Sequence, residues 1–483
     1  MSSILMFSFA FSQDTETEEV SPEQIMQQKI DDLSNDINEM KSIFNQENAT
    51  LQSKIMMLEK ANKDLAKELG DNLENQKSQF ETSWNNGYSI SSGDGMHSLK
   101  FGGRLMLDES RWTIDDNSAL KGLEIRRARL YHAGHVYGNI INYKFDFDLS
   151  NASISFKDMY VELNMQGAKK SWGKIRAGHF KQPFGLESLT SSNYMTFMER
   201  SLPNSLNSTR GAGTMYHTSC FSDKLSMQFG YFLEGKNNHM NFATSDAHNI
   251  NGRLTYLPIN KDDKLLHIGT SFVRRANLTQ TVEDDHVNNL MINENPENHF
   301  TGNMLNYVGR ADAMNSFGTE MSLVLGSLSF QAEYMMSSIG EIHHHDEDHD
   351  EDHGDHEDVG MSGYYAQVSY FLTGEKREYK SSYSGFGRVS PKKNYLDNKG
   401  FGALELAIRY SGMNFDETFN MENDMFVPEG SASLNNFTVG LNWYINPAMR
   451  FMFNYVMSTK KSDADGMEDV KENALMSRIQ INF

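Results

Sequence analysis

A run of histidines and acids at residues 343–358 contains the residue types that most directly indicate chemistry. It holds six histidines and nine Asp or Glu residues, and neither Lys nor Arg. Imidazole and carboxylate groups together are ligands for Zn²⁺, Cu²⁺ or Ni²⁺. The spacing is irregular, so we expect a loop that binds Zn²⁺ weakly through His343, His344, His345, His349, His353 and His356. The alternative is a solvated low-complexity loop without metal.

Basic residues at alternate positions form a second candidate site. Arginine suits tetrahedral oxyanions, because its planar guanidinium donates two hydrogen bonds at once. The bases that alternation places on the polar face are Arg104, Arg127, Arg129, Lys174, Arg176, Arg253, Arg409 and Arg478. Such a row would pass an anion between neighbouring sites. The alternative is an ordinary porin wall, in which acids opposite the bases set up a transverse electric field. Alternation places six acids on the same face as the bases, namely Asp108, Asp146, Asp148, Asp158, Glu162 and Glu405.

The elements that carry these bases alternate with a period of two from residue 98 onward. In 143–149, for example, Tyr143, Phe145 and Phe147 share one face, and the charged residues between them share the other. Segments of about ten residues repeat this pattern, as strands do. The pattern fits a soluble sandwich with an apolar core. It fits equally a membrane barrel, whose apolar face meets lipid and whose polar face lines a lumen.

Three further features favour the transmembrane barrel. The 386 residues of 98–483 accommodate sixteen antiparallel strands, the connections alternate between short and long, and the chain ends in an alternating strand closed by Phe483. We predict strands at 99–108, 122–137, 140–149, 155–165, 173–180, 211–219, 224–235, 248–257, 265–275, 316–325, 328–338, 361–372, 401–413, 434–445, 449–459 and 473–483. This count makes 276–315 one long loop and leaves 373–400 as an unusually long connection on the short-turn side.

The N-terminal part predicts different elements. Residues 1–12 resemble a secretory signal peptide, with an apolar stretch and small residues before a cleavage point after Ser12. Residues 21–80 show apolar residues at alternating spacings of three and four, which predicts an α-helical coiled coil that self-associates as a trimer. A single amphipathic helix is the alternative. Residues 81–97 are expected to form a linker to the barrel at 98–483.

Composition excludes several classes of function. The net charge of −21 argues against a nucleic-acid binder. Residues 14–81 and 343–358 account for −9 each, so the barrel itself is nearly neutral. No apolar run approaches the roughly 18 residues of a membrane-spanning helix. The single Cys220 excludes an intrachain disulfide, and no motif of a hydrolase, P-loop enzyme or metalloprotease is present, so we do not expect an enzyme.

The barrel region resembles the phosphate-selective porins O and P. The resemblance rests on six stretches in order, namely LEIRRARLYHAG (123–134), GKIRAGHFKQPFGLESLTSS (173–192), SFQAEY (329–334), FLTGEKREY (371–379), FGALELAIRYS (401–411) and TVGLNWY (438–444). It implies a trimeric barrel of sixteen strands in the bacterial outer membrane, with the third loop folded inward. It also implies pore-lining roles for Arg126, beside Arg127 and Arg129, and for Lys181, Glu187, Glu199 and Arg200 of that loop.

Two functions follow from these features. The first is a passive channel for small anions, with phosphate or polyphosphate as candidate solutes. The second is a surface protein that captures or imports metal through the histidine-rich loop. The expected partners are two further copies of the chain, outer-membrane lipid, the transported anions and, through the coiled coil, the cell wall.

Overall fold

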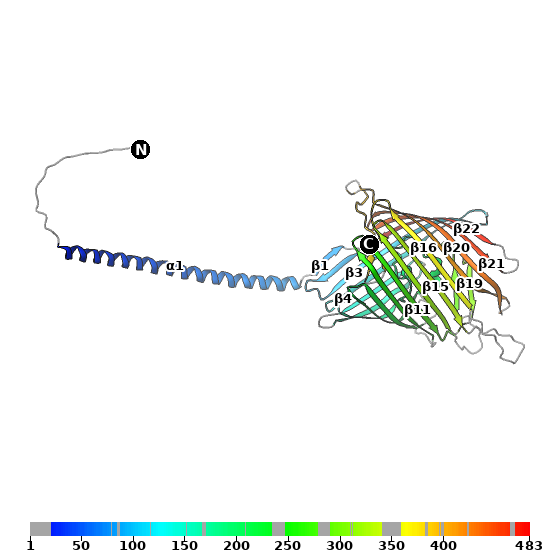
Figure 1. Ribbon diagram of the computed structural model, residues 1–483, viewed down its shortest axis with the longest axis horizontal. Coiled ribbons are helices and arrows are strands. Elements are labelled where there is room, and N and C mark those ends of the chain that lie inside the picture. The colour runs from blue at the N-terminus through cyan, green and yellow to red at the C-terminus, as the bar shows by residue number, and fades with distance from the viewer. Residues whose placement is uncertain are drawn as a thin grey trace, which may run out of the picture. The chain divides into compact units, whose positions relative to one another are not determined.

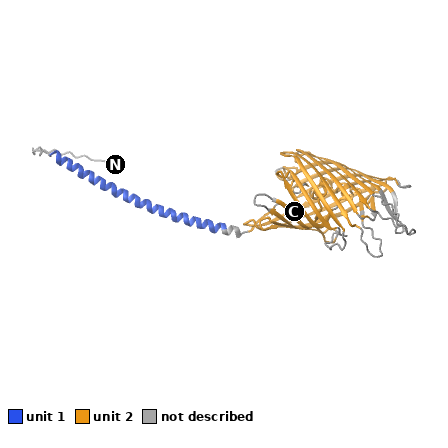
Figure 2. Cartoon of the chain, turned by 60° about the horizontal axis from the view of Figure 1, so that its bottom comes forward, with its two compact units in different colours: residues 1–78 blue, residues 79–483 orange. Residues whose placement is uncertain are grey.

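The computed structural model divides the chain into two units, residues 1–78 and 79–483 (Figure 2). It describes residues 21–78, 80–84, 87–115, 117–150, 152–166, 171–207, 209–233, 247–278, 290–309, 311, 313–340, 359–381, 385–395, 397, 400–422, 425–463 and 469–483. The signal peptide expected at 1–12 lies outside the described residues and stays a prediction. Among the described residues, no helix is both long and apolar enough to cross a membrane.

The described part of the first unit, from residue 21 onward, forms one helix, α1 (Pro22–Ser78). The helix begins where the Ser21 and Gln24 side chains can cap its first turn. The Ser21 amide donates to Gln24 Oε1 at 3.1 Å, and the Gln24 amide donates to Ser21 Oγ at 3.4 Å. This reciprocal capping box satisfies two backbone donors that the first helical turn leaves without partners.

The second unit is a closed antiparallel barrel, which confirms the predicted fold and strand count (Figure 1). Its sixteen strands are β3 (Ser98–Ile114), β4 (Leu120–Val136), β5 (Ile141–Asp148), β6 (Ser155–Gln166), β7 (Ser171–Lys181), β8 (Arg210–Cys220), β9 (Leu225–Leu233), β10 (His248–Lys261), β11 (Lys264–Ala276), β14 (Ala313–Leu325), β15 (Leu328–Gly340), β16 (Val359–Phe371), β19 (Ala403–Glu422), β20 (Met425–Asn446), β21 (Met449–Ser462) and β22 (Val470–Asn482). Strand β3 pairs with both β4 and β22, which closes the ring.

The barrel is apolar outside and polar inside. On β19, the outward Ile408 is 49% exposed, whereas the neighbouring inward Arg409 is 1% exposed. The same inversion recurs around the wall, with exposed Leu, Ile, Phe and Tyr and buried Asn, Ser, Glu and Arg. A soluble sandwich would show the reverse, so the wall is built to face lipid.

The linker expected at 81–97 is in part a hairpin, β1 (Phe80–Trp84) and β2 (Tyr88–Ser92). Its position has a simple cause. Strand β22 ends at Asn482, opposite Arg104, so residues 98–101 of β3 would leave an open edge. Strand β2 pairs with these residues, from Tyr88 opposite Phe101 to Ser91 opposite Ser98. Filling the edge satisfies backbone groups that would otherwise lack partners.

Two connections carry short strands of their own. The fifth loop, between β11 and β14, holds β12 (Leu290–Glu294) and β13 (Leu305–Gly309), which pair only with each other. Tyr307 therefore lies on a strand outside the ring, and the predicted count of sixteen is unaffected. The long connection between β16 and β19 holds β17 (Tyr379–Lys380) and β18 (Gly385–Phe386).

Candidate functional site

The third loop, residues 182–209, folds into the lumen and is fixed there by barrel side chains. It contains the short helix α2 (Leu186–Leu189) and the 3-10 turn η1 (Leu202–Leu206). Glu333 of β15 accepts the amides of Leu186 at 2.8 Å and Glu187 at 2.7 Å. The Glu187 carboxylate in turn accepts from Arg409 of β19 at 3.2 Å. The inward position that the resemblance implied is therefore produced by buried acids on both sides of the contact.

A β-bulge places two neighbouring arginines in the lumen. On β4, Arg127 lies opposite Met106 and Ile125 lies opposite Leu107, so Arg126 is the extra residue. Strict alternation would turn Arg126 towards lipid. The bulge instead lets both side chains point inward, because an inserted residue shifts the phase of the strand. This explains how the RRAR stretch supplies three lumen-facing bases, Arg126, Arg127 and Arg129.

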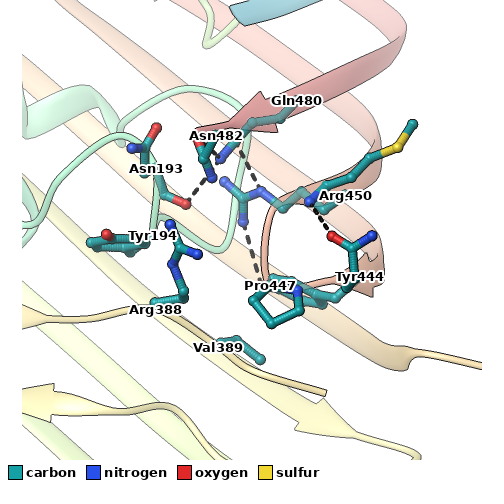
Figure 3. A pocket seen from close by; sticks show the side chains of 11 residues that line it. Asn193, Tyr194, Arg388, Val389, Tyr444, Pro447, Arg450, Gln480 and Asn482 are labelled. Atoms are coloured by element: carbon teal, nitrogen blue, oxygen red, sulfur yellow. Dashed lines mark hydrogen bonds between the residues drawn. The ribbon is translucent and has the colours of Figure 1, made fainter. Parts of the chain in front are cut away.

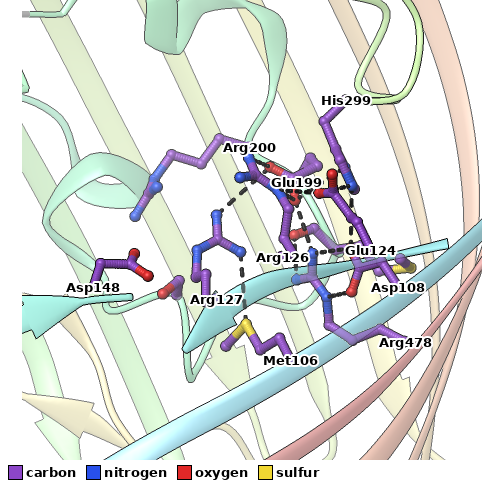
Figure 4. Close-up of polar contacts among 12 residues, drawn as sticks. Met106, Asp108, Glu124, Arg126, Arg127, Asp148, Glu199, Arg200, His299 and Arg478 are labelled. Atoms are coloured by element: carbon purple, nitrogen blue, oxygen red, sulfur yellow. Dashed lines mark hydrogen bonds and ion pairs between the residues drawn. The ribbon is translucent and has the colours of Figure 1, made fainter. Parts of the chain in front are cut away.

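Glu199 of the third loop is the centre of an ion-pair network with arginines of the barrel wall (Figure 4). Arg126 donates two hydrogen bonds to its carboxylate, at 3.1 and 3.0 Å, and Arg478 donates another at 2.8 Å. Arg127 Nη2 lies 3.7 Å from the same group. Burial alone would raise the pKa of Glu199, but these arginines hold it well below its usual value. The carboxylate therefore stays ionised and neutralises much of the charge around it.

A histidine of the fifth loop joins this network. His299 Nε2 lies 2.7 Å from Glu124 Oε1 and 3.6 Å from Asp108 Oδ2, and Nδ1 lies 3.6 Å from Glu199 Oε1. Asp108, Glu199 and His299 have the ligand types of a metal site. Arg478 already holds Asp108 through bonds of 2.7 and 2.6 Å, however. With three guanidinium groups beside the acids, the cluster is a charge network that docks the loop.

Most of the predicted bases have a carboxylate partner. Arg129 donates to Asp148 at 2.8 Å, and Lys174 donates to Glu162 at 3.0 Å. Glu162 also receives the guanidinium of Arg176, at 2.8 Å from Nε. On the other side of the lumen, Arg253 of β10 pairs with Glu320 of β14, and Arg409 pairs with Glu187 and Glu297. These five bases line the lumen as predicted, but as neutralised pairs.

Three predicted bases contact neutral oxygen atoms. Arg104 Nη1 donates to Ser192 Oγ at 2.8 Å. Lys181 donates to the carbonyls of Ser188 and Thr190, the latter at 3.2 Å. Arg200 donates to the carbonyls of Glu187 at 3.2 Å and Thr190 at 3.0 Å. Their positive charge is therefore less compensated than that of the paired bases.

These three bases belong to a larger basic wall. We use this name for the lumen surface formed by β3–β8 and the facing part of the third loop, with Arg104, Arg127, Arg129, Lys157, Lys181, Arg200 and Arg210. Lys181 lies within electrostatic reach of Arg200, Arg210 and Arg129, and of one carboxylate, that of Asp158. Three of the bases are paired, Arg127 with Glu199, Arg129 with Asp148 and Arg210 with Asp158, the last at 2.9 Å. The wall as a whole retains positive charge.

Part of the opposite side of the lumen is filled with apolar side chains. Phe184 and Leu202 of the third loop, with Ile292 and Tyr307 of the fifth loop, pack against inward residues of β11–β20. Those wall residues are Val273, Met314, Met335, Ile339, Val359, Met361, Met413, Phe415, Ala432 and Leu434. Both infolded loops therefore cover the same side, where they bury an apolar cluster between the loops and the wall.

The long connection between β16 and β19 also enters the lumen, which accounts for its length. Phe386 donates its amide to Thr190 Oγ1 of the third loop at 3.3 Å. The Arg377 guanidinium lies 3.6 Å over the Phe386 ring and donates to Gln331 Oε1 at 2.9 Å. This connection thus supports the third loop from the short-turn end of the barrel.

A small pocket lies where this connection meets the third loop and β20–β22 (Figure 3). Asn193, Tyr194 and Arg388 line it, together with Arg450 and Gln480. Arg450 donates to Gln480 Oε1 at 3.0 Å and to the Met195 carbonyl at 2.8 Å. We did not select Arg450 from the sequence, although alternation along β21 with Phe451 and Phe453 would have placed it in the lumen.

The histidine-rich loop lies outside the described residues. The zinc site at His343, His344, His345, His349, His353 and His356 therefore stays a prediction. Metal uptake as the function of the protein receives no support from the comparisons with known proteins.

Those comparisons cover the barrel from end to end. A family model described as phosphate-selective porin O and P matches residues 99–483. Porin O of Pseudomonas aeruginosa is 26% identical over 423 residues, which are 82% of this chain and 91% of that protein. Among solved structures, the anion-selective porin of Comamonas acidovorans is 13% identical, covers 80% of this chain and 100% of its own, and has a TM-score of 0.46. The DcaP channel of Acinetobacter baumannii is 9% identical, with 81% and 99% coverage and a TM-score of 0.48. Because the family model matches the whole barrel, the chain belongs to the phosphate-selective porin O and P family, which makes it a channel protein of the bacterial outer membrane.

Proposed function

We propose that the barrel is a passive channel for small oxyanions of the phosphate class, which pass between the third loop and the basic wall. The observation that carries this proposal is the group formed by Arg104, Lys181 and Arg200, buried or half-buried bases whose hydrogen bonds go to neutral oxygens. A positive charge without a carboxylate partner attracts a passing anion more strongly than a neutralised pair does. Family membership supports phosphate as the solute.

The apolar filling on the far side supports the same route. Ions avoid surfaces that offer no hydrogen bonds, because leaving water there costs several kcal/mol. An anion is therefore expected to follow the basic wall. Arg129 and Arg127 extend the wall along β4 and give the anion successive partners, so that each step exchanges one contact for another.

The test is reversal potential in planar bilayers under a salt gradient. Replacing Arg104, Lys181 and Arg200 by Gln removes three charges from the wall, and we expect loss of most of the anion preference and of the block of chloride current by phosphate. The matched control is Arg111→Gln on β3, whose side chain is 69% exposed on the outer face. Equal reversal potentials in the triple variant and the wild type would contradict the proposal.

We also propose that the channel assembles as a homotrimer in outer-membrane lipid. Family membership supports the trimer, and the apolar outer surface supports the lipid contact. The measurement is migration of unheated and heated protein on denaturing gels, where a trimer that resists detergent runs at three times the monomer mass. Contact between the N-terminal helix and the cell wall stays a prediction.

A further inference from the structure

Helix α1 carries an apolar seam that no other described residue of its unit covers. The seam residues recur at heptad spacing and are about half exposed or more, for example Ile37 at 48% and Leu58 at 64%. The full seam is Ile30, Leu33, Ile37, Met40, Phe44, Leu51, Ile55, Leu58, Leu65 and Leu69. A helix of 57 residues with one such stripe is stable in water chiefly when the stripe is covered.

The charges beside the seam indicate what covers it. With Ile30 and Ile37 at position a, Asp36 occupies g and Lys41 the following e. With Ile55 and Asn62 at position a, Lys54 occupies g and Glu59 the following e. In a parallel, in-register coiled coil, each g residue faces the next e residue of the neighbouring helix. Both positions therefore bring opposite charges together between identical chains.

We propose that α1 forms a parallel, in-register, three-stranded coiled coil with the α1 helices of two further copies of this chain. The inference rests on the homotrimer proposed above, because each helix is joined at its C-terminal end to a barrel, and barrels in one membrane share one orientation. In an antiparallel coiled coil, the C-terminal ends of neighbouring helices, and therefore their barrels, would lie at opposite ends of the coiled coil. The seam from Ile30 to Leu69 extends over about 60 Å at 1.5 Å per residue.

The residues at positions a and d do not by themselves select the number of helices in the coiled coil, so the trimeric barrels determine it. Ile at a with Leu at d favours two strands, as at Ile30 and Leu33 or Ile55 and Leu58. Met40, Phe44 and Leu69 depart from that rule. The step of eleven residues from Phe44 to Ile55 inserts four residues, which locally unwinds the supercoil. Asn62 at position a then fixes the register of the second half, because a buried amide requires the amide of its neighbour.

The experiment uses the full-length protein in detergent, with its only cysteine removed by Cys220→Ser. Ile37→Cys places a thiol in the core at position a, and Ser42→Cys places one at the outward position f. A reagent with three maleimide groups should link three chains through position 37, in roughly tenfold higher yield than through position 42, because f residues face away from the axis. The barrel trimer is measured on the same samples by its resistance to detergent.

Charge reversal tests the pairing itself. Lys41→Asp sets like charges opposite each other and should lower the three-chain yield, and Asp36→Lys with Lys41→Asp should restore it. A barrel trimer without three-chain product, or with equal product from positions 37 and 42, overturns the coiled coil and leaves the homotrimer standing. Product limited to two chains overturns the three-stranded arrangement. A monomeric barrel with no product overturns the homotrimer and the coiled coil together.

Discussion

Arg126 of β4 and Glu199 of the third loop form an ion pair with two hydrogen bonds, Nε to Oε1 at 3.1 Å and Nη2 to Oε2 at 3.0 Å. The pair joins the barrel wall to the tip of the loop across 73 residues of sequence. It depends on the bulge in β4, since Arg126 would otherwise face lipid. One local irregularity in a strand thus adds a second anchor for the loop, beside that of Glu333, and changes the charge next to it.

We predict that Glu199→Gln increases anion preference and loosens the loop. The change keeps the shape of the side chain but leaves Arg126, Arg127 and Arg478 with one carboxylate fewer. Losing one partner of a buried pair costs about 3–5 kcal/mol of local stability. Reversal potentials should shift towards the value of a pore that conducts anions alone, and single-channel current noise should rise. The control is Glu109→Gln, which removes one carboxylate that is 53% exposed on the outer face of β3. A fall in anion preference would contradict the prediction.

The closure of the barrel offers a test of stability. Gly103 exchanges backbone hydrogen bonds with the terminal Phe483, at 2.6 and 3.1 Å. A Cβ atom at position 103 would lie 2.6 Å from both the Phe483 ring and the Arg129 carbonyl. We expect Gly103→Ala to destabilise the barrel by about 1–3 kcal/mol, the usual cost of overpacking. Unfolding in urea from lipid vesicles measures this. Gly252→Ala is the control, because a Cβ there meets nothing within 4 Å, and equal midpoints for the two variants would contradict the expectation.

The strands could be predicted because their signal is local. An outward residue such as Ile408 and an inward residue such as Arg409 differ in polarity at every step, so the period of two identifies each strand. Strand limits were less accurate. Strand β3 continues to Ile114, beyond the predicted end at 108. Its exposed positions there are Glu109 and Arg111, so the apolar outer face that identifies a strand is lost.

The pairing of the charges could not be predicted, because each partner lies far away in sequence. Arg409 meets Glu297 of the fifth loop, 112 residues away, and so does not act as an unpaired base. The phase of β4 was correct for Arg127 and Arg129, but alternation carries no signal for the bulge at Arg126. The sequence therefore identified many of the bases that line the lumen, although it missed Arg210 and Arg450. Only the structure separates the bases with a carboxylate partner from those that contact neutral oxygens.

The fifth loop should respond to pH through His299. Burial lowers the pKa of His299 to about 4. In the undocked loop the pKa would be near the ordinary 6.5. As the pH falls from about 6.5 towards 4, the undocked loop gains a proton that the docked loop does not, so docking weakens by up to about 3 kcal/mol. Above pH 6.5 this effect is absent.

We therefore expect single-channel conductance to rise and become noisier below about pH 6 as the fifth loop leaves the lumen. His299→Gln should remove this pH dependence, because glutamine does not titrate. The control is His97→Gln, an exposed residue before β3. A wild-type conductance that stays constant between pH 8 and pH 4.5 would show that His299 does not govern the docking of this loop.

The histidine-rich loop provides the last prediction, which concerns metal. We expect zinc binding in the micromolar range that deletion of residues 343–358 abolishes, while the barrel still inserts and conducts. Neutral imidazoles bind metal and protonated ones do not, so the affinity should fall as the pH drops through about 6.5. A matched variant replaces the six histidines by Asn and keeps the nine acids. Zinc titration by calorimetry then separates the two ligand types, since carboxylates alone retain their ions to much lower pH. Undiminished zinc affinity in the Asn variant would assign the binding to the acids and refute the imidazole site.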